Sequence, residues 1–180
     1  MKNLEELVTL LEQHFAPFDP NTEAIIHNNA GKLEVFHKQD ALKAYETYQG
    51  VFERMLATTS QKDLKERGCK ILFLKIQYEI QKRELVNAFR SLQALRNGGE
   101  GFYFHWANAC IGSFLMNEFK YQQSFQERKQ ELELVVQSLD YDHREVSRIT
   151  KPYKKELLKE VKKLNSWLGK LWYNTKQHHG

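Results

Sequence analysis

Proline, glycine and cysteine are all scarce in this chain. Its 180 residues include three prolines, nine glycines and two cysteines. So few turn-forming residues favour long regular elements with few connections. Cys69 and Cys110 lie far apart, without the paired spacing of a disulfide framework or a zinc site, which fits a reducing compartment. We therefore expect a fold that is held together by core packing rather than by cross-links.

Segments that direct a protein to a membrane are not found either. No apolar run approaches the length that is needed to span a bilayer. The first six residues, from Met1 to Glu6, lack the features of a signal peptide. We expect a soluble, cytoplasmic protein with no membrane among its partners.

Motifs of the common catalytic classes are missing as well. The sequence has no phosphate-binding loop, no GxGxxG, no nucleophile elbow and no HExxH pair. The glycine-rich stretch 97–101 follows a predicted helix and lacks a lysine, so we interpret it as a helix cap. Both cysteines fall in apolar helical patterns and are expected in the core. We expect a protein without enzymatic activity, metal or cofactor, although a helical nuclease with an unrecognised site remains an alternative.

Helical periodicity is what the sequence does show. Apolar residues recur at spacings of three, four and seven along most of the chain, and no segment alternates as a strand would. The predicted helices cover residues 4–15, 35–56, 64–95, 106–139 and 143 onwards. We predict an all-α fold of long amphipathic helices in two bundle-like subdomains, an N-terminal one over 1–97 and a basic C-terminal one over 98–180.

Several local signals mark where these helices begin and end. Ser60 with Asp63 predicts a capping box before the third helix. The Asn97-Gly98-Gly99 sequence predicts its end, because glycine accepts a positive φ. The polar stretch 121–124 is interpreted as a kink in the fourth helix. Pro152 either bends the last helix or begins a fresh one.

Charge is distributed unevenly along the chain. The net charge is +4, yet residues 1–62 hold six Lys and Arg against nine Asp and Glu, whereas residues 141–180 hold ten against four. An acidic front and a basic rear indicate different partners for the two ends.

The basic residues of the rear segment fall on one side of a predicted helix over 151–173. A helix turns by about 100° per residue. On that wheel one half carries Arg148, Lys151, Lys155, Lys159, Lys162, Lys163 and Lys170. The other half carries Tyr153, Leu157, Val161, Leu164, Leu168 and Leu171. A one-sided row of lysines is a candidate track for a polyanion, while a solvated helix face is the plain alternative.

Aromatic residues lie close to these cations in the sequence, and cationic grooves with flat rings are typical of proteins that bind single-stranded nucleic acid. The same helix would also suit the acidic, hydrophobic tail of a partner protein, or less well an acidic lipid surface. The candidate binding residues are Phe125, Arg128, Lys129, Arg148, Lys151, Tyr153, Lys155, Lys159, Lys162, Lys163 and Trp172.

Four patches in order resemble the primosomal replication protein N-double-prime (PriC) family. The first is Val35-Phe36, followed by apolar positions that end in Leu56, and the second is the stretch 72–89 with Gln81. The third is Tyr121-Gln122-Gln123-Ser124-Phe125-Gln126-Glu127-Arg128, where Phe125 and Arg128 match after a one-residue insertion. The fourth is Tyr153-Lys154-Lys155-Glu156-Leu157, in which Glu156 stands where the family tends to have arginine.

This resemblance implies an all-helical adaptor of replication restart that has no enzymatic activity. Such an adaptor binds single-stranded or forked DNA and the C-terminal tail of the single-stranded-DNA-binding protein, and it helps to load the replicative helicase. The basic C-terminal part would contact the DNA and the acidic tail. A protein-interaction bundle that binds no nucleic acid, such as a phage or plasmid accessory factor, is the alternative.

Overall fold

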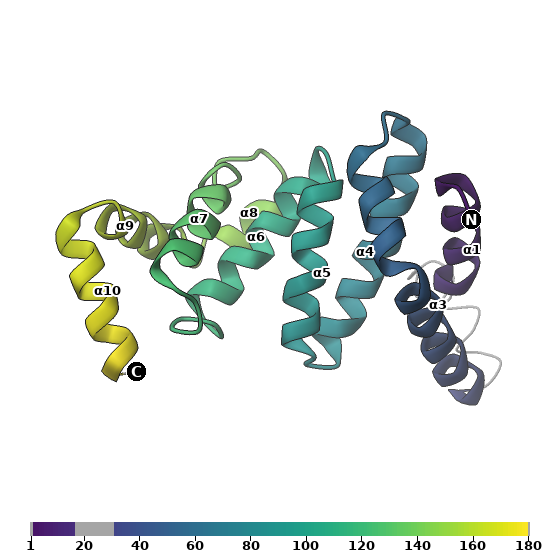
Figure 1. Ribbon diagram of the computed structural model, residues 1–180, viewed down its shortest axis with the longest axis horizontal. Helices are drawn as coiled ribbons and strands as arrows, with labels where there is room; N and C mark the ends of the chain where they lie inside the picture. Colours follow the sequence, from purple (N-terminus) through teal and green to yellow (C-terminus); the bar gives the residue numbers. More distant parts are fainter. Residues whose placement is uncertain (1, 17–30, 180) are drawn as a thin grey trace. The chain divides into compact units, whose positions relative to one another are not determined.

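The structure, a computed structural model, describes residues 2–16 and 31–179, and the side chains of 2–16 and 39–177. Helices are the only regular elements in these ranges, which confirms the predicted all-α fold. The chain divides into two compact units, Met1–Tyr103 and Phe104–Gly180 (Figure 1). The sequence pattern placed this division at 97/98. It falls later because the rings of Phe102 and Tyr103 pack edge-on against Phe73 of the first unit, with centroids 6.1 and 5.8 Å away.

The first unit is a bundle of four helices among its described residues. They are α1 (Leu4–Phe15), α3 (Gly31–Thr58), α4 (Lys62–Gln81) and α5 (Leu85–Gly98). Asn3 begins α1, because its side-chain oxygen accepts a hydrogen bond from the Glu6 amide at 2.9 Å. The apolar stripe of α1 is buried as predicted. The predicted loop around Asn28 lies outside the described residues, as do the side chains of Val35 and Phe36.

The predicted helix over 64–95 is wrong as a single helix, because the chain reverses at residues 82–84. Arg83 adopts a φ of 60°, in the left-handed region. The Glu84 amide donates to the Glu79 carbonyl at 2.9 Å, and the Arg83 amide donates to the Ile80 carbonyl at 3.0 Å. This is a Schellman C-cap, which usually carries glycine where Arg83 stands. With no glycine or proline at this point, the sequence pattern offered no stop signal, and α5 folds back along α4.

The predicted capping box of Ser60 and Asp63 is also wrong. The structure begins α4 at Lys62 with Gln61 at the N-cap position, and no side chain caps it. Instead the Gln61 amide donates to the Thr59 hydroxyl at 3.2 Å. The N-cap position is therefore Gln61, one residue after the predicted Ser60.

The second unit contains α6 (Phe102–Met116) apart from its first two residues, followed by α7 (Phe125–Val136), α8 (Arg144–Thr150), α9 (Lys154–Leu164) and α10 (Trp167–His179). The predicted helix over 106–139 is therefore wrong as one element, because residues 117–124 form a turn rather than a kink. Ser124 starts α7 by accepting a hydrogen bond from the Glu127 amide at 3.2 Å. Fully buried core side chains of this unit include Leu115, Leu132, Val135, Val146 and Leu157.

Pro152 precedes a fresh helix rather than bending an existing one. Tyr153, next to it, is buried, and its hydroxyl donates to the Ala109 carbonyl at 2.7 Å. Its ring occupies the space above Gly112, where an added Cβ would lie 2.7 Å from a ring carbon. The absence of a side chain at Gly112 thus lets Tyr153 join α6 to the start of α9.

The predicted helix over 151–173 is interrupted at Asn165 and Ser166. The Asn165 amide ends α9 by donating to the Val161 carbonyl at 3.0 Å. The Ser166 hydroxyl accepts from the Gly169 amide at 2.8 Å and so starts α10. This break turns α10 away from the direction of α9 (Figure 1). The single helical wheel consequently fails after Leu164.

Two absences hold for the described part of the chain. None of its helices combines the length and apolar character that crossing a membrane requires. Both cysteines are buried and unbonded to each other, as expected of core residues; Cys69 Sγ donates to the Gly98 carbonyl at 3.6 Å.

Candidate nucleic-acid interface

The exposed side of α9 carries a row of lysines. Leu157 and Leu164 anchor the helix in the core. Lys155, Lys159 and Lys162, at spacings of four and three, point to the opposite side and are exposed. Lys151, in the turn before α9, is exposed as well. We call these four residues the lysine face. This part of the predicted strip survives in three dimensions, because it lies wholly before the break at Asn165.

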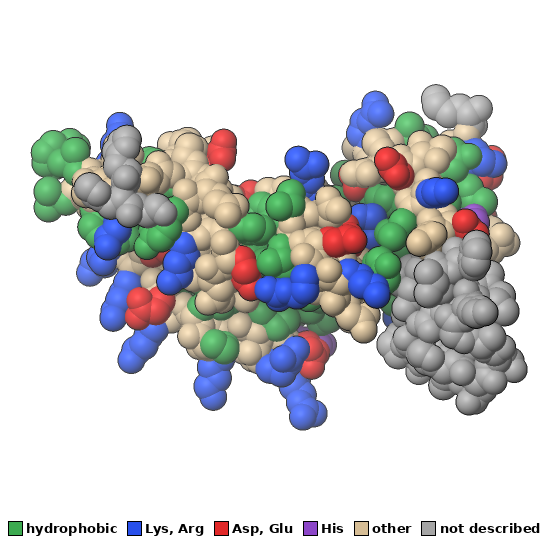
Figure 2. Space-filling view, turned by 90° about the horizontal axis from the view of Figure 1, so that it is seen from below, with side chains coloured by type: hydrophobic (Ala, Val, Ile, Leu, Met, Phe, Trp, Pro, Cys, Tyr) green, Lys and Arg blue, Asp and Glu red, His purple; other side chains and the backbone are tan. Residues whose placement is uncertain are grey.

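Most of the lysine face is available to a ligand. Within the described residues, Lys151, Lys155 and Lys162 form no ion pair. Lys159 pairs with Glu156 at 3.9 Å, and both side chains are largely exposed. An exposed pair of this kind contributes about 0–1 kcal/mol, so a phosphate can readily replace it. Figure 2 shows Lys and Arg side chains gathered over the part of the second unit that contains α9 and α10.

Two other predicted cations lie on different elements and have acidic neighbours of their own. Arg148, in α8, pairs with Glu145 at 3.1 Å, and Lys129, in α7, pairs with Glu133 at 4.0 Å. Arg148 is exposed and Lys129 is half-buried. Neither Arg148 nor Lys129 lines the pocket described in the next paragraph.

A pocket of about 180 Å³ opens between α9, α10 and the segment that joins α6 to α7. We call it the α9–α10 pocket. Its lining residues are Met116, Lys120, Tyr121, Arg128, Glu156, Lys159, Glu160, Lys163, Trp172 and Tyr173. Arg128 and Glu160 neutralise each other, which leaves three lysines against Glu156. The pocket is therefore a place where positive charge and aromatic rings meet.

Two aromatic side chains of this pocket are exposed to solvent. Trp172 is 37% exposed and Tyr121 is 43% exposed. Lys163 Nζ lies 4.9 Å from the centre of the Trp172 ring, a cation–π contact that places charge beside a flat surface. This arrangement suits a nucleobase with its phosphate.

The other predicted rings are occupied by the protein itself. Phe125 packs edge-on against Tyr173, with ring centroids 5.8 Å apart. Tyr173 is buried, its hydroxyl donates to the Gln123 carbonyl, and burial raises its pKa. Tyr153 is a core residue. Phe125 and Tyr153 were predicted to bind a ligand, and the structure instead gives both a packing role.

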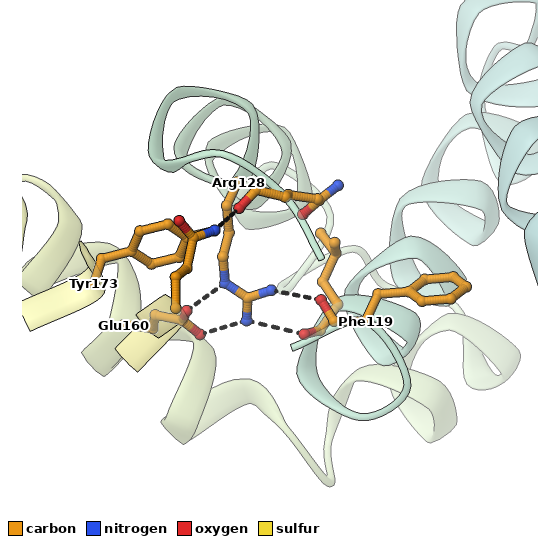
Figure 3. A network of polar contacts seen from close by, with 7 residues as sticks. Phe119, Arg128, Glu160 and Tyr173 are labelled. Atoms are coloured by element: carbon orange, nitrogen blue, oxygen red, sulfur yellow. Dashed lines mark hydrogen bonds and ion pairs between the residues drawn. The ribbon is translucent and has the colours of Figure 1, made fainter. Parts of the chain in front are cut away.

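Arg128 requires the main correction to the predicted site. It is 2% exposed, although the sequence pattern placed it in the interface. Its guanidinium donates to both Glu160 carboxylate oxygens at 2.5 and 2.9 Å, to the Phe119 carbonyl at 3.0 Å and to the Leu115 carbonyl at 2.9 Å (Figure 3). Four of its five N–H donors are taken up inside the protein, and its burial keeps a phosphate from reaching it. Arg128 joins α7 to α9 and thereby fixes the lysine face from behind.

Lys120 and Tyr121 are the pocket residues that the sequence reasoning missed. They lie in the 117–124 turn, which the periodicity merged into one long helix. A signal was present, however, because Ser124 and Glu127 have the Ser-x-x-Glu spacing of a helix start. Had that signal been used, residues 117–123 would have been assigned to an exposed connection beside the basic segment.

Two hydroxyl clusters deserve comparison with catalytic sites. Ser91 Oγ donates to Glu79 at 2.7 Å and accepts from Lys75 Nζ at 2.8 Å. In the second unit, Ser138 Oγ lies 2.8 Å from His105 Nδ1. Ser138 is fully buried; Ser91 is buried too but lines a pocket of about 300 Å³, where its hydroxyl and the Lys75 ammonium are both already bonded to Glu79. The clusters hold helices together, and we assign no chemistry to them.

Compared with known proteins, the chain matches no family model, no curated protein and no solved structure.

Proposed function

We propose that this protein is a non-enzymatic helical adaptor that binds single-stranded or forked DNA through the lysine face and the α9–α10 pocket. The observation that carries this proposal is the row of Lys155, Lys159 and Lys162 on α9, with Lys151 in the turn before it. All four are exposed, and three of them have no ion-pair partner among the described residues. Unpaired lysines along one helix face neutralise successive phosphates and release counterions.

The pocket would add a second kind of contact. Lys159 lines the pocket and also belongs to the lysine face, so the two surfaces are continuous. A strand whose phosphates follow the lysine face would bring a base to Trp172 and Tyr121. Stacking requires unpaired bases, and this favours single strands or the junction of a fork over intact duplex.

The place of this activity in the cell follows from the resemblance to the PriC family. On that basis we propose that the protein acts in replication restart, binds the acidic C-terminal tail of the single-stranded-DNA-binding protein, and helps to load the replicative helicase. The acidic tail and DNA would then compete for the same lysines, since both are anionic.

A titration of labelled DNA across salt concentration tests the proposal. Fluorescence anisotropy would be measured with single-stranded, forked and blunt duplex DNA from about 50 to 200 mM salt, where several phosphate contacts change affinity by orders of magnitude. We expect the fork and the single strand to bind more tightly than the duplex. Each single substitution of Lys155, Lys159 or Lys162 by glutamine should lower the slope of log affinity against log salt concentration by about one phosphate contact.

Lys43, an exposed lysine of α3 in the first unit, supplies the matched control. A Lys43→Gln variant should keep the slope of the unsubstituted protein. No binding at the lowest salt concentration, or equal losses for Lys43→Gln and the α9 variants, would contradict the proposal.

A further inference from the structure

Helix α10 presents its apolar side to solvent. Trp167 is 74% exposed, Leu168 is 70% exposed and Leu171 is 49% exposed. We call these three residues the α10 apolar face. The buried side of the same helix consists of Gly169 and Tyr173. An amphipathic helix ordinarily buries its large apolar residues. Here the reverse holds, and an exposed apolar cluster of this kind marks a site of interaction.

Specific contacts hold α10 in this orientation. The Tyr173 hydroxyl and the Gln177 side-chain amide both donate to the Gln123 carbonyl. Gly169 lies so close to the Lys163 carbonyl that a side chain would not fit. If α10 rotated to bury Trp167 and Leu171, these hydrogen bonds would be lost and a larger residue would meet the end of α9.

The charges around the face indicate what kind of partner fits. Residues 161–180 include no Asp or Glu. At about 100° per residue, Lys170 flanks the α10 apolar face on one side and Lys176 flanks it on the other. Both lysines are exposed. The face is therefore an apolar row between two positive margins, and its complement is an apolar row between two negative margins.

We propose that the α10 apolar face docks an amphipathic helix of a partner protein, with leucine-like residues along one side and Asp or Glu at both flanks. A second copy of this chain would bring lysines against lysines. A bilayer fits less well, because the face spans about 7 Å of helix axis and polar Thr175 follows it on the same side. The surface lies outside the lysine face, so this inference does not rest on DNA binding.

A designed peptide supplies a direct test. The probe is a labelled peptide of about 18 residues with leucines at i, i+3, i+4 and i+7 and glutamates at the flanks. A scrambled peptide of the same composition is its control. We expect saturable binding of the first peptide only, with a blue shift of tryptophan emission. Buried Trp106 should contribute little to that shift.

Variants of the full chain locate the binding. Leu171→Ala combined with Trp167→Ala should weaken peptide binding at least about tenfold, as expected for central apolar anchors. Val86→Ala provides the matched control, since Val86 is an apolar residue of α5 that is 58% exposed. Lys170→Gln with Lys176→Gln should weaken binding severalfold at low salt and less at high salt.

Three outcomes would overturn the inference. The first is equal binding of the scrambled peptide, and the second is no loss in the Trp167 and Leu171 variant. The third is that the face binds something else: the protein dimerises, or it floats with anionic phosphatidylserine vesicles. In either case Leu171→Ala would abolish the association and the peptide would not compete with it. DNA binding by the Leu171 variant should remain unchanged, so failure here is distinguishable from failure of the proposed function.

Discussion

Arg128 of α7 and Glu160 of α9, 32 positions apart in the sequence, form a bidentate ion pair with nitrogen–oxygen distances of 2.5 and 2.9 Å. The arginine is almost fully buried and also donates to two backbone carbonyls. Arg128, which the sequence pattern predicted to bind phosphate, instead holds α9 in place from its buried side. The side of α9 that carries Glu160 is bonded to Arg128 inside the protein, and the lysine face points away from it to solvent.

Replacement of Arg128 by methionine should destabilise the protein by about 3–5 kcal/mol, because it removes the partner of Glu160, whose side chain is only 13% exposed, and the donor to two buried carbonyls. Arg128→Lys should restore little, since one ammonium does not reproduce four hydrogen bonds in a fixed geometry. Urea unfolding monitored by circular dichroism measures the loss. As a control, Lys159→Gln removes only an exposed pair and should change stability by less than about 0.5 kcal/mol. Equal effects of the two substitutions would contradict the support role.

Removal of the open ring of the pocket should weaken DNA binding without unfolding the protein. Trp172→Ala is expected to cost about 1–3 kcal/mol of affinity for single-stranded DNA, which is typical of one stacked base. The salt slope should stay the same, because no phosphate contact is lost. Trp167→Ala is the comparison, as that ring lies outside the pocket. If Trp167→Ala reduces DNA affinity as much as Trp172→Ala does, stacking in the pocket is not the cause.

Glycine at position 83 should stabilise the first unit. Arg83 holds a left-handed conformation that costs a residue with a side chain about 1–2 kcal/mol, whereas glycine adopts it without strain. After the greater entropy of glycine in the unfolded chain is allowed for, we expect Arg83→Gly to gain about 0.5–1 kcal/mol. Thermal and urea unfolding measure it. Arg83→Ala keeps the left-handed conformation of a residue with a side chain, so it should not raise the free energy of unfolding. If alanine does raise it, the arginine side chain, not the backbone strain, is the cause.

Alanine should have opposite effects at two helical glycines. At Gly112 an added Cβ would lie 2.8 Å from a methyl carbon of Val135 and against the Tyr153 ring, so Gly112→Ala should destabilise by about 1–3 kcal/mol. At Gly50 no atom lies within 4 Å of the added Cβ, so Gly50→Ala should stabilise α3 by about 0.5–1 kcal/mol. The two variants, measured by the same unfolding experiment, are each other's control.

Alkaline pH should destabilise the protein through its buried thiols. Burial raises the pKa of Cys69 from 9.0 to about 12. The folded state therefore keeps a proton that the unfolded state releases above pH 9, and stability is full below that pH and falls as pH rises towards 12. Each such group lowers the free energy of unfolding by about 1.4 kcal/mol per pH unit in this window. The Cys69→Ala variant should show a shallower decline; an unchanged slope would exclude the thiol as a cause.

Local signals in the sequence were sufficient for much of the fold. The apolar stripe of Leu4, Leu7, Val8 and Leu11 needed only its spacing to predict α1, and glycine at 98 and 99 marked the end of α5. Helix breaks without glycine or proline were missed at Arg83 and at Asn165. At such points tertiary packing, rather than local propensity, decides where the chain turns.

The sequence by itself determined that this protein is helical, that its net positive charge is concentrated in the last forty residues, and that Lys155, Lys159 and Lys162 of α9 share one side. Helical periodicity is a local property, so those results required no knowledge of the fold. Only the tertiary structure decided that Arg128 is buried, that Lys120 and Tyr121 join the pocket, and that α10 turns its tryptophan and leucines outward. These depend on the break at Asn165 and on contacts between residues distant in the chain, which no local pattern records.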